Sequence, residues 1–347
     1  MQILSETVTL HTEHPFGISR ETIQTQRSVI VQLQHLDHVG WGEVTENRFY
    51  GRTAESIQEN IRIAADILSG MKEILPCSGG VKQIWDRVAQ RILPDTFALS
   101  AIDSAVCDWA AKHQNVPTYQ IWGLDWTSKV PSSFTIGLDT IDRMVTKLRQ
   151  RPGWPVYKIK LGSDDDLDIV RRLRQETDAV FRVDANGGWD VDKTIAMSQA
   201  MKTLNVQFIE QPLPIDASES AKRDVFTHSR LPLIADEDCQ VAADVAKCSG
   251  IYHGISVKLC KCGGLTPAID MLRQARRLGL STMVGCMVES SIGISAAAQL
   301  LPLLDFADLD GAELLDSDPA MGASVDRGIV TLAVGNGHAA SMRQHSE

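Results

Sequence analysis

The sequence has no excess of positive charge and no long hydrophobic run. Its 34 lysines and arginines are outnumbered by 44 aspartates and glutamates, which leaves a net charge of −10. Nucleic acids and anionic membrane surfaces are bound through basic patches, so this balance argues against both as partners. The first residues, Met1-Gln2-Ile3-Leu4-Ser5-Glu6, contain neither a basic segment nor an apolar one. We therefore expect no secretion signal and no membrane span.

Cysteine is scarce and scattered, with seven residues that never form a Cys-x-x-Cys pair. An odd number without paired spacing predicts no disulfide framework and favours reduced thiols in the cytoplasm. Cys260 and Cys262 flank Lys261 closely. No further cluster of Cys or His completes a set of four zinc ligands, so a metal site at this pair is not expected.

The N-terminal part alternates apolar and polar residues in short segments typical of half-buried strands. The alternation runs through residues 3–10, 28–36 and 40–45, which predicts an antiparallel meander. Thr53 is a suitable N-cap for a helix that ends near Gly70, and a second helix is expected from about Phe97 to His113. Strands followed by helices predict an α+β capping domain, which we assign to residues 1–125.

From Ser132 onward, short apolar strands alternate with longer amphipathic segments about every 22 to 27 residues. Eight strands alternating with helices predict a parallel (β/α)₈ barrel, and 347 residues leave room for it beside a smaller domain. We assign the barrel to residues 126–311 and expect residues 312–347 to complete the capping domain. The predicted strands are 133–137, 156–161, 181–185, 208–211, 233–236, 254–259, 282–286 and 306–310.

Three acidic residues end three of these strands at equal intervals. Asp184, Glu210 and Asp236 each close a short apolar run, and consecutive members lie 26 residues apart. Because one β/α unit takes about that many residues, the three carboxylates should converge at neighbouring strand ends. Converging carboxylates repel one another unless a cation lies among them, and an all-oxygen ligand set favours Mg²⁺. One such residue alone would more often cap a helix, but three at matching positions predict a metal site.

Lysines lie on two further predicted strands. Lys158 and Lys160 are two residues apart, so both side chains should face the same side of their strand. Lys258 is on the sixth strand, roughly across the barrel mouth. A proton on the carbon next to a carboxylate is very weakly acidic, and a divalent cation would stabilise the enolate that its removal leaves. A lysine whose pKa is lowered by the metal and by its neighbour could act as the base, and one base per face would allow inversion.

Taken together, these motifs resemble the muconate lactonizing enzyme subgroup of the enolase superfamily, in which a lysine base works with Mg²⁺. The resemblance extends over the whole chain, including the capping domain, and implies the predicted barrel. The motifs that carry it are Lys158-Ile159-Lys160, Asp184-Ala185-Asn186, Glu210-Gln211-Pro212, Asp236-Glu237 and Lys258.

The resemblance assigns roles residue by residue. It implies that Lys160 and Lys258 are the two acid/base catalysts, with Lys158 beside the substrate carboxylate to lower the pKa of Lys160. The residues that directly follow the ligand positions would support the metal ligands, and they are Asn186, Gln211 and Glu237. The implied Mg²⁺ ligands are Asp184, Glu210 and Asp236.

The pair Asp308 and Asp310 on the eighth strand resembles the Asp-x-Asp signature of dipeptide epimerases, where it holds the free ammonium group of the substrate. The run 284–287 is similar to that of bacterial L-Ala-D/L-Glu epimerases, which makes Met287 a substrate-binding candidate. The implied activity is Mg²⁺-dependent inversion of the α-carbon of the second residue of L-Ala-D/L-Glu or a related L-Ala-L-Xaa dipeptide. The two aspartates could instead cap the following helix or pair with a lysine such as Lys261.

The sequence does not determine the type of side chain on the second residue of the dipeptide. Two segments of the capping domain, about 16–26 and 47–53, correspond to loops that close over the barrel in the family. Each contains an arginine that could meet a substrate carboxylate, Arg20 in the first and Arg52 in the second. Glu21 offers Arg20 an ion pair instead, so acidic, hydrophobic and basic second residues are all possible.

Other activities of the subgroup use the same metal and lysines. They are those of N-acylamino acid racemases, o-succinylbenzoate synthases and cycloisomerases, whose substrates have no free ammonium group, so Asp308 and Asp310 argue against them. A catalytically silent barrel that serves as a binding protein would not need the carboxylates and lysines together. Barrels of this family are often homo-oligomers, and the resemblance implies the same here.

Overall fold

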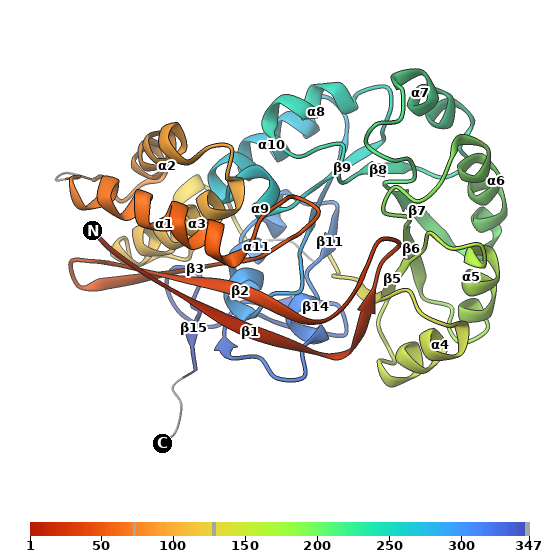
Figure 1. Cartoon of the computed structure of the whole chain (residues 1–347), viewed down its shortest axis with the longest axis horizontal. Helices are drawn as coiled ribbons and strands as arrows, with labels where there is room; N and C mark the ends of the chain where they lie inside the picture. The colour runs from red at the N-terminus through yellow and green to blue at the C-terminus, as the bar shows by residue number, and fades with distance from the viewer. Residues whose placement is uncertain (72–73, 127–129, 344–347) are drawn as a thin grey trace.

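The computed structural model describes residues 1–71, 74–126 and 130–343. A small N-terminal unit of sheet and helices lies against a larger barrel (Figure 1). The last residues of the predicted capping domain, 344–347, lie outside the described part. Within the described residues, no helix is both long enough and apolar enough to cross a lipid bilayer.

The N-terminal unit is an antiparallel sheet packed against helices. Gly40 and Gly42 allow β3 to lie directly on α3, because a Cβ at either position would meet a carbonyl oxygen of that helix at 2.0 Å. Nearly all of α3 is buried, which explains why its sequence is mostly apolar. The elements are β1 (Gln2–Gly17), β2 (Thr22–His35), β3 (His38–Thr45), α1 (Ala54–Ser69), α2 (Ser78–Ile92), α3 (Thr96–His113) and η1 (Thr118–Trp122).

The barrel confirms the predicted fold class. Among the described residues, eight parallel strands are hydrogen-bonded in the order β4 to β11, and a bridge between Ser132 and Ala307 joins the two edges. The strands are β4 (Phe134–Ile136), β5 (Val156–Lys160), β6 (Val180–Asp184), β7 (Val206–Glu210), β8 (Leu233–Ala235), β9 (Gly254–Val257), β10 (Ser281–Gly285) and β11 (Phe306–Asp308).

Helices cover the outside of the barrel and connect its strands (Figure 1). They are α4 (Ile141–Gln150), α5 (Asp166–Arg174), α6 (Val191–Met201), α7 (Glu219–His228), α8 (Ala242–Cys248), α9 (Leu259–Cys262), α10 (Leu265–Arg277) and α11 (Ser291–Ala298). Short 3₁₀ turns are η2 (Lys202–Leu204), η3 (Leu301–Leu303) and η4 (Gly311–Leu314). The C-terminal strands are β12 (Ala320–Met321), β13 (Ser324–Asp326), β14 (Ile329–Thr331) and β15 (Ser341–Met342).

Three local expectations were wrong. Helix α2 was not predicted, because its N-cap Cys77 makes no capping hydrogen bond and its first turn contains two glycines. The predicted 16–26 loop is mostly strand, because Phe16 and Gly17 pair with Ile23 and Thr22 and leave only residues 18–21 as the turn. All eight barrel strands end earlier than predicted, six of them by one residue and the sixth and eighth by two, at Val257 and Asp308.

The C-terminal segment returns to the N-terminal unit. The backbone N–H of His338 donates to Asp108 of α3 at 2.6 Å, and Ile30 of β2 packs with Ala320 and Ala340 in one buried cluster. The boundaries assigned to the two domains, 1–125 with 312–347 and 126–311, remain predictions.

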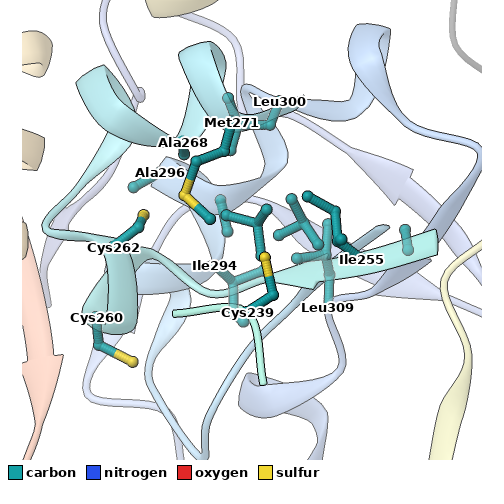
Figure 2. Close-up of a cluster of buried hydrophobic side chains, with 14 of the residues drawn as sticks. Cys239, Ile255, Cys260, Cys262, Ala268, Met271, Ile294, Ala296, Leu300 and Leu309 are labelled. Carbon is teal, nitrogen blue, oxygen red and sulfur yellow. The ribbon is translucent and has the colours of Figure 1, made fainter. Parts of the chain in front are cut away.

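The hydrophobic core includes side chains of the barrel strands and of the helices that cover them. Figure 2 shows Cys239, Ile255, Met271, Ile294 and Leu309, which belong to one buried apolar cluster. Cys260 and Cys262 are also free thiols in this region and are buried. Within the described residues, the one group of acidic, Cys or His side chains placed to hold a metal contains neither of them.

Candidate active site

The three predicted metal ligands lie side by side at the carboxyl ends of their strands. Asp184 and Glu210 are the last residues of β6 and β7 and are paired in register, and Asp236 directly follows β8. All three side chains are buried, and one carboxylate oxygen from each lies within 4.8 Å of the others. The 26-residue spacing therefore corresponds to adjacent strand ends that bring three carboxylates together.

The electrostatics of this triad suit a hard cation. Both carboxylate oxygens of Glu210 are buried without a hydrogen bond of acceptable geometry, although Lys158 Nζ lies 2.8 Å from one of them. Burial and the neighbouring Asp184 and Asp236 raise the pKa of Glu210 to about 7, against the opposing effect of Lys158. An oxygen-only donor set with an unsatisfied carboxylate fits Mg²⁺.

The three predicted catalytic lysines approach the triad from two sides. Lys160 Nζ donates to Asp184 Oδ2 at 2.7 Å, and Lys258 Nζ donates to Asp236 Oδ2 at 2.8 Å. Lys158 lies on the same face of β5 as Lys160, with its Nζ 3.3 Å from Asp184 Oδ2. The alternation expected for β5 thus places both ammonium groups at one site.

The charges of the protein act against the predicted lowering of a lysine pKa. Burial would lower the pKa of Lys158, but Asp308, Glu210 and Asp184 outweigh it and hold that pKa well above its ordinary value. The same balance, with Asp236 as the main partner, raises the pKa of Lys258. A lowered pKa would need the positive charge of a bound cation next to these carboxylates.

Lys261 is a further buried cation, and the alternative that paired it with the two aspartates of the eighth strand is wrong. It was considered as a partner of Asp308 or Asp310, but its Nζ donates to Asp236 Oδ1 at 2.6 Å and also to the backbone oxygen of Asp236. Two more backbone oxygens, of Cys239 and Ser256, complete its contacts at 3.1 Å. Lys261 therefore fixes the orientation of a predicted metal ligand from behind.

Residues that follow the ligands support them through backbone contacts. Gln211 adopts a left-handed φ of 36°, and its Oε1 accepts hydrogen bonds from the N–H groups of Asp236 and Asp238 at 3.1 Å. Asn186 has a φ of 46° and donates its N–H to Asp184 Oδ1 at 2.9 Å. These constrained backbones hold two predicted ligands in position.

Asp308 and Asp310 form a second acidic site next to the lysines. Asp308 accepts from Lys158 Nζ at 2.8 Å and from Ser133 Oγ at 2.7 Å. Asp310 accepts from the N–H and the hydroxyl of Thr135. Burial would raise the pKa of Asp308, but Lys158 outweighs it and lowers that pKa, whereas burial and the charge of Asp308 raise the pKa of Asp310 to about 7. The pair therefore combines a firmly ionised carboxylate with one that is partly protonated near neutral pH.

A cavity lies above these groups, between the barrel mouth and the N-terminal hairpin. Every predicted lysine and substrate contact lines it except Arg52, and the triad, which the lysines contact, is buried behind the lining residues. The predicted residues in its wall are Lys158, Lys160, Lys258, Asp308, Asp310, Met287 and Arg20.

The two arginines of the capping loops have different surroundings. Arg20 Nη2 pairs with Glu237 Oε1 at 2.7 Å, so the alternative of an ion pair with Glu21 is wrong. Arg52 was wrongly considered as a substrate contact, because its guanidinium donates to Pro94 O at 2.6 Å, outside the cavity. Only one of the two arginines therefore faces the site.

The chain matches two family models that together span most of its length. Residues 2–123 match the N-terminal domain of mandelate racemase / muconate lactonizing enzyme, and residues 141–343 match the model described as enolase C-terminal domain-like.

Relatives of known name match nearly end to end. An L-Ala-D/L-amino acid epimerase of Flavobacterium johnsoniae is 43% identical over 97% of this chain and 98% of its own length. An L-Ala-D/L-Glu epimerase of Bacteroides thetaiotaomicron is 34% identical over 93% of this chain and 83% of its own. Among solved structures, a dipeptide epimerase of Enterococcus faecalis with Mg and L-Leu-L-Tyr superposes with a TM-score of 0.91 at 26% identity, covering 98% of this chain and 99% of that one.

Proposed function

Because the chain belongs to the mandelate racemase / muconate lactonizing enzyme family of the enolase superfamily, we propose that it is a Mg²⁺-dependent dipeptide epimerase. It would invert the α-carbon of the second residue of a dipeptide such as L-Ala-L-Xaa. The relatives and the solved structure named above support this reaction class, and the cavity contains the groups that it needs.

Asp184, Glu210 and Asp236 are proposed to hold the Mg²⁺ ion. One oxygen from each converges on the same point, and both oxygens of Glu210 lack a well-aligned hydrogen bond. Bound there, the ion would supply positive charge opposite the two negative charges that develop on the substrate carboxylate. Lys261 and Gln211 keep Asp236 in place for this role through the contacts described above.

Lys160 and Lys258 are proposed as the two proton-transfer groups. They belong to β5 and to the turn after β9, on different sides of the triad, and each keeps a small exposed area towards the cavity. One amine would take the α-proton while the ammonium on the other face returns one, which inverts the carbon. Lys158, deeper and almost fully buried, would face the substrate carboxylate.

The observation that selects a dipeptide is the pair Asp308 and Asp310. A buried carboxylate pair at the cavity wall, next to the lysines, suits a free ammonium group at a fixed distance from the reacting carbon. N-acylamino acids, succinylbenzoate precursors and muconates offer no such group, so the related activities would leave these carboxylates without a substrate partner.

Incubation with Mg²⁺ and a dipeptide library in D₂O tests the proposal. Incorporation of deuterium at the α-carbon of the second residue, together with inversion, is the expected result by NMR. Absence of exchange in every dipeptide would overturn it, and exchange confined to N-acylamino acids would move the enzyme to the racemase activity.

A cytoplasmic location is proposed on the seven free thiols, which suit a reducing compartment. A small-molecule substrate is the proposed partner, with no nucleic acid or membrane. Assembly into homo-oligomers remains a prediction.

A further inference from the structure

One wall of the cavity is apolar. Phe16 and Ile23 are a cross-strand pair at the end of the β1–β2 hairpin, which extends over the barrel mouth (Figure 1). Both pack in one cluster with Val288 and Leu314 of the barrel, and all four line the cavity. A substrate side chain on this wall would lose water contact against apolar carbon, which favours an apolar side chain.

Among the described residues that line the cavity, Arg20 is the one cationic side chain besides the three lysines. Its guanidinium donates to Glu237 Oε1 at 2.7 Å and to Asn186 O at 2.9 Å, and it lies 4.0 Å from the centre of the Phe49 ring. Glu237 is only 3% exposed, and its other oxygen has no hydrogen-bond partner. Turning Arg20 towards a substrate carboxylate would leave a buried charge unpaired, which is strongly unfavourable.

We propose that the second residue of the preferred dipeptide carries an apolar side chain, and that Arg20 holds the hairpin to the barrel instead of binding a substrate carboxylate. This rests on the proposed dipeptide epimerase activity. Glu21 also lines the cavity, but it is exposed to water and so offers a basic side chain little attraction. Size and hydrophobicity, not charge, would then select the substrate.

Steady-state kinetics with L-Ala-L-Leu, L-Ala-L-Glu and L-Ala-L-Lys test the inference on the unaltered enzyme. We expect kcat/KM for L-Ala-L-Leu to exceed that for either charged dipeptide by about 10-fold or more. A preference for L-Ala-L-Glu or L-Ala-L-Lys would overturn the inference and leave the epimerase activity standing. Turnover of no dipeptide would overturn the proposed function, and the inference with it.

A matched pair of variants tests the role of Arg20. Glu237→Gln removes its charge partner, so the ratio of kcat/KM for L-Ala-L-Glu to that for L-Ala-L-Leu should rise about 10-fold. Glu21→Gln removes the same charge from the same cavity without releasing Arg20, and its ratio should change less than about 2-fold. Because each ratio is measured within one variant, a general loss of activity cancels. Equal shifts in both variants would contradict the assignment of Arg20.

Discussion

The base and the roof of the cavity hold their charges in opposite ways. At the base, formed by the strand ends of the barrel, the carboxylates and lysines share partners, and neither oxygen of Glu210 has a well-aligned hydrogen bond, although Lys158 Nζ lies 2.8 Å from one of them. At the roof, formed by the hairpin end and residues 47–50, Arg20 is bound to Glu237 and Asn186, and Phe16 and Ile23 add an apolar surface. The base is therefore suited to bind ions and move protons, and the roof to select a side chain.

The largest effect is expected from removing a base. Lys160→Ala or Lys258→Ala should lower epimerisation by about 10²- to 10⁴-fold, because either change removes the proton-transfer group of one face. The rate is measured by chiral chromatography of the dipeptide. Lys82→Ala, in an exposed ion pair on α2, is the matched control and should keep its activity. Full epimerisation in both cavity variants would mean that the chemistry does not reside in these lysines.

A smaller effect is expected at the acidic pair. Asp308→Asn should raise KM for a dipeptide by about 10- to 100-fold, because a charged hydrogen bond to the substrate ammonium is lost. Asp310→Asn should cost less, since burial and Asp308 raise its pKa to about 7 and part of the population is already neutral. Titration calorimetry with Mg²⁺ alone should show nearly unchanged affinity in both. An equal loss of metal binding would place these residues among the metal ligands.

The contact between α3 of the N-terminal unit and α10 of the barrel gives a pH-dependent prediction. Asp103 of α3 accepts from the N–H of Thr266 at 2.8 Å and from its hydroxyl at 2.7 Å, and burial raises its pKa from 3.8 to about 7. Since the unfolded chain releases this proton more readily, stability should fall as pH rises between those two values. Asp103→Asn should reduce that fall by about 1 kcal/mol or more.

Urea midpoints measured across this pH range give the result for Asp103→Asn. Asp86→Asn, at an exposed position of α2, is the control and should follow the unaltered protein. An unchanged pH slope in Asp103→Asn would show that this carboxyl is ionised in the folded state as easily as in the unfolded one.

The smallest effect on activity is expected at Arg52. Arg52→Met should change kcat/KM less than about 2-fold while lowering the free energy of unfolding by about 1 kcal/mol, because its guanidinium bonds to Pro94 O and lies outside the cavity. Kinetics and urea denaturation of the same sample separate the two quantities. A loss of activity larger than the loss of stability would return Arg52 to the substrate site.

The base of the cavity could be read from the sequence because its residues follow local rules. Equal spacing places carboxylates such as Asp184 and Glu210 on adjacent strand ends, and alternation places Lys158 and Lys160 on one face. These regularities depend only on repeating β/α units. The eight strands were predicted for the same reason, although each ends one or two residues earlier than predicted.

The roof could not be read in this way because it depends on contacts between distant segments. Arg20 and Glu237 lie 217 positions apart, and the neighbouring Glu21 was the partner that sequence proximity suggested. The alternative that paired Lys261 with the acidic pair was wrong. Helix α9 begins directly after Lys258, and within it Lys261 contacts Asp236 instead. Helix α2 escaped prediction because its first turn has no capping side chain. The contacts of Arg20 and Lys261 depend on packing between segments that no local pattern encodes.

Lys160 and Lys258 are proposed to move protons on opposite faces of one carbon, and the isotope content of the first product distinguishes two bases from one. A dipeptide with protium at the α-carbon is incubated with Mg²⁺ and enzyme in D₂O and stopped at low conversion. If two bases act, the inverted product should carry deuterium in nearly every molecule, because its proton comes from the second lysine after exchange with solvent. Inverted product that retains the original protium would show a single base and contradict the account.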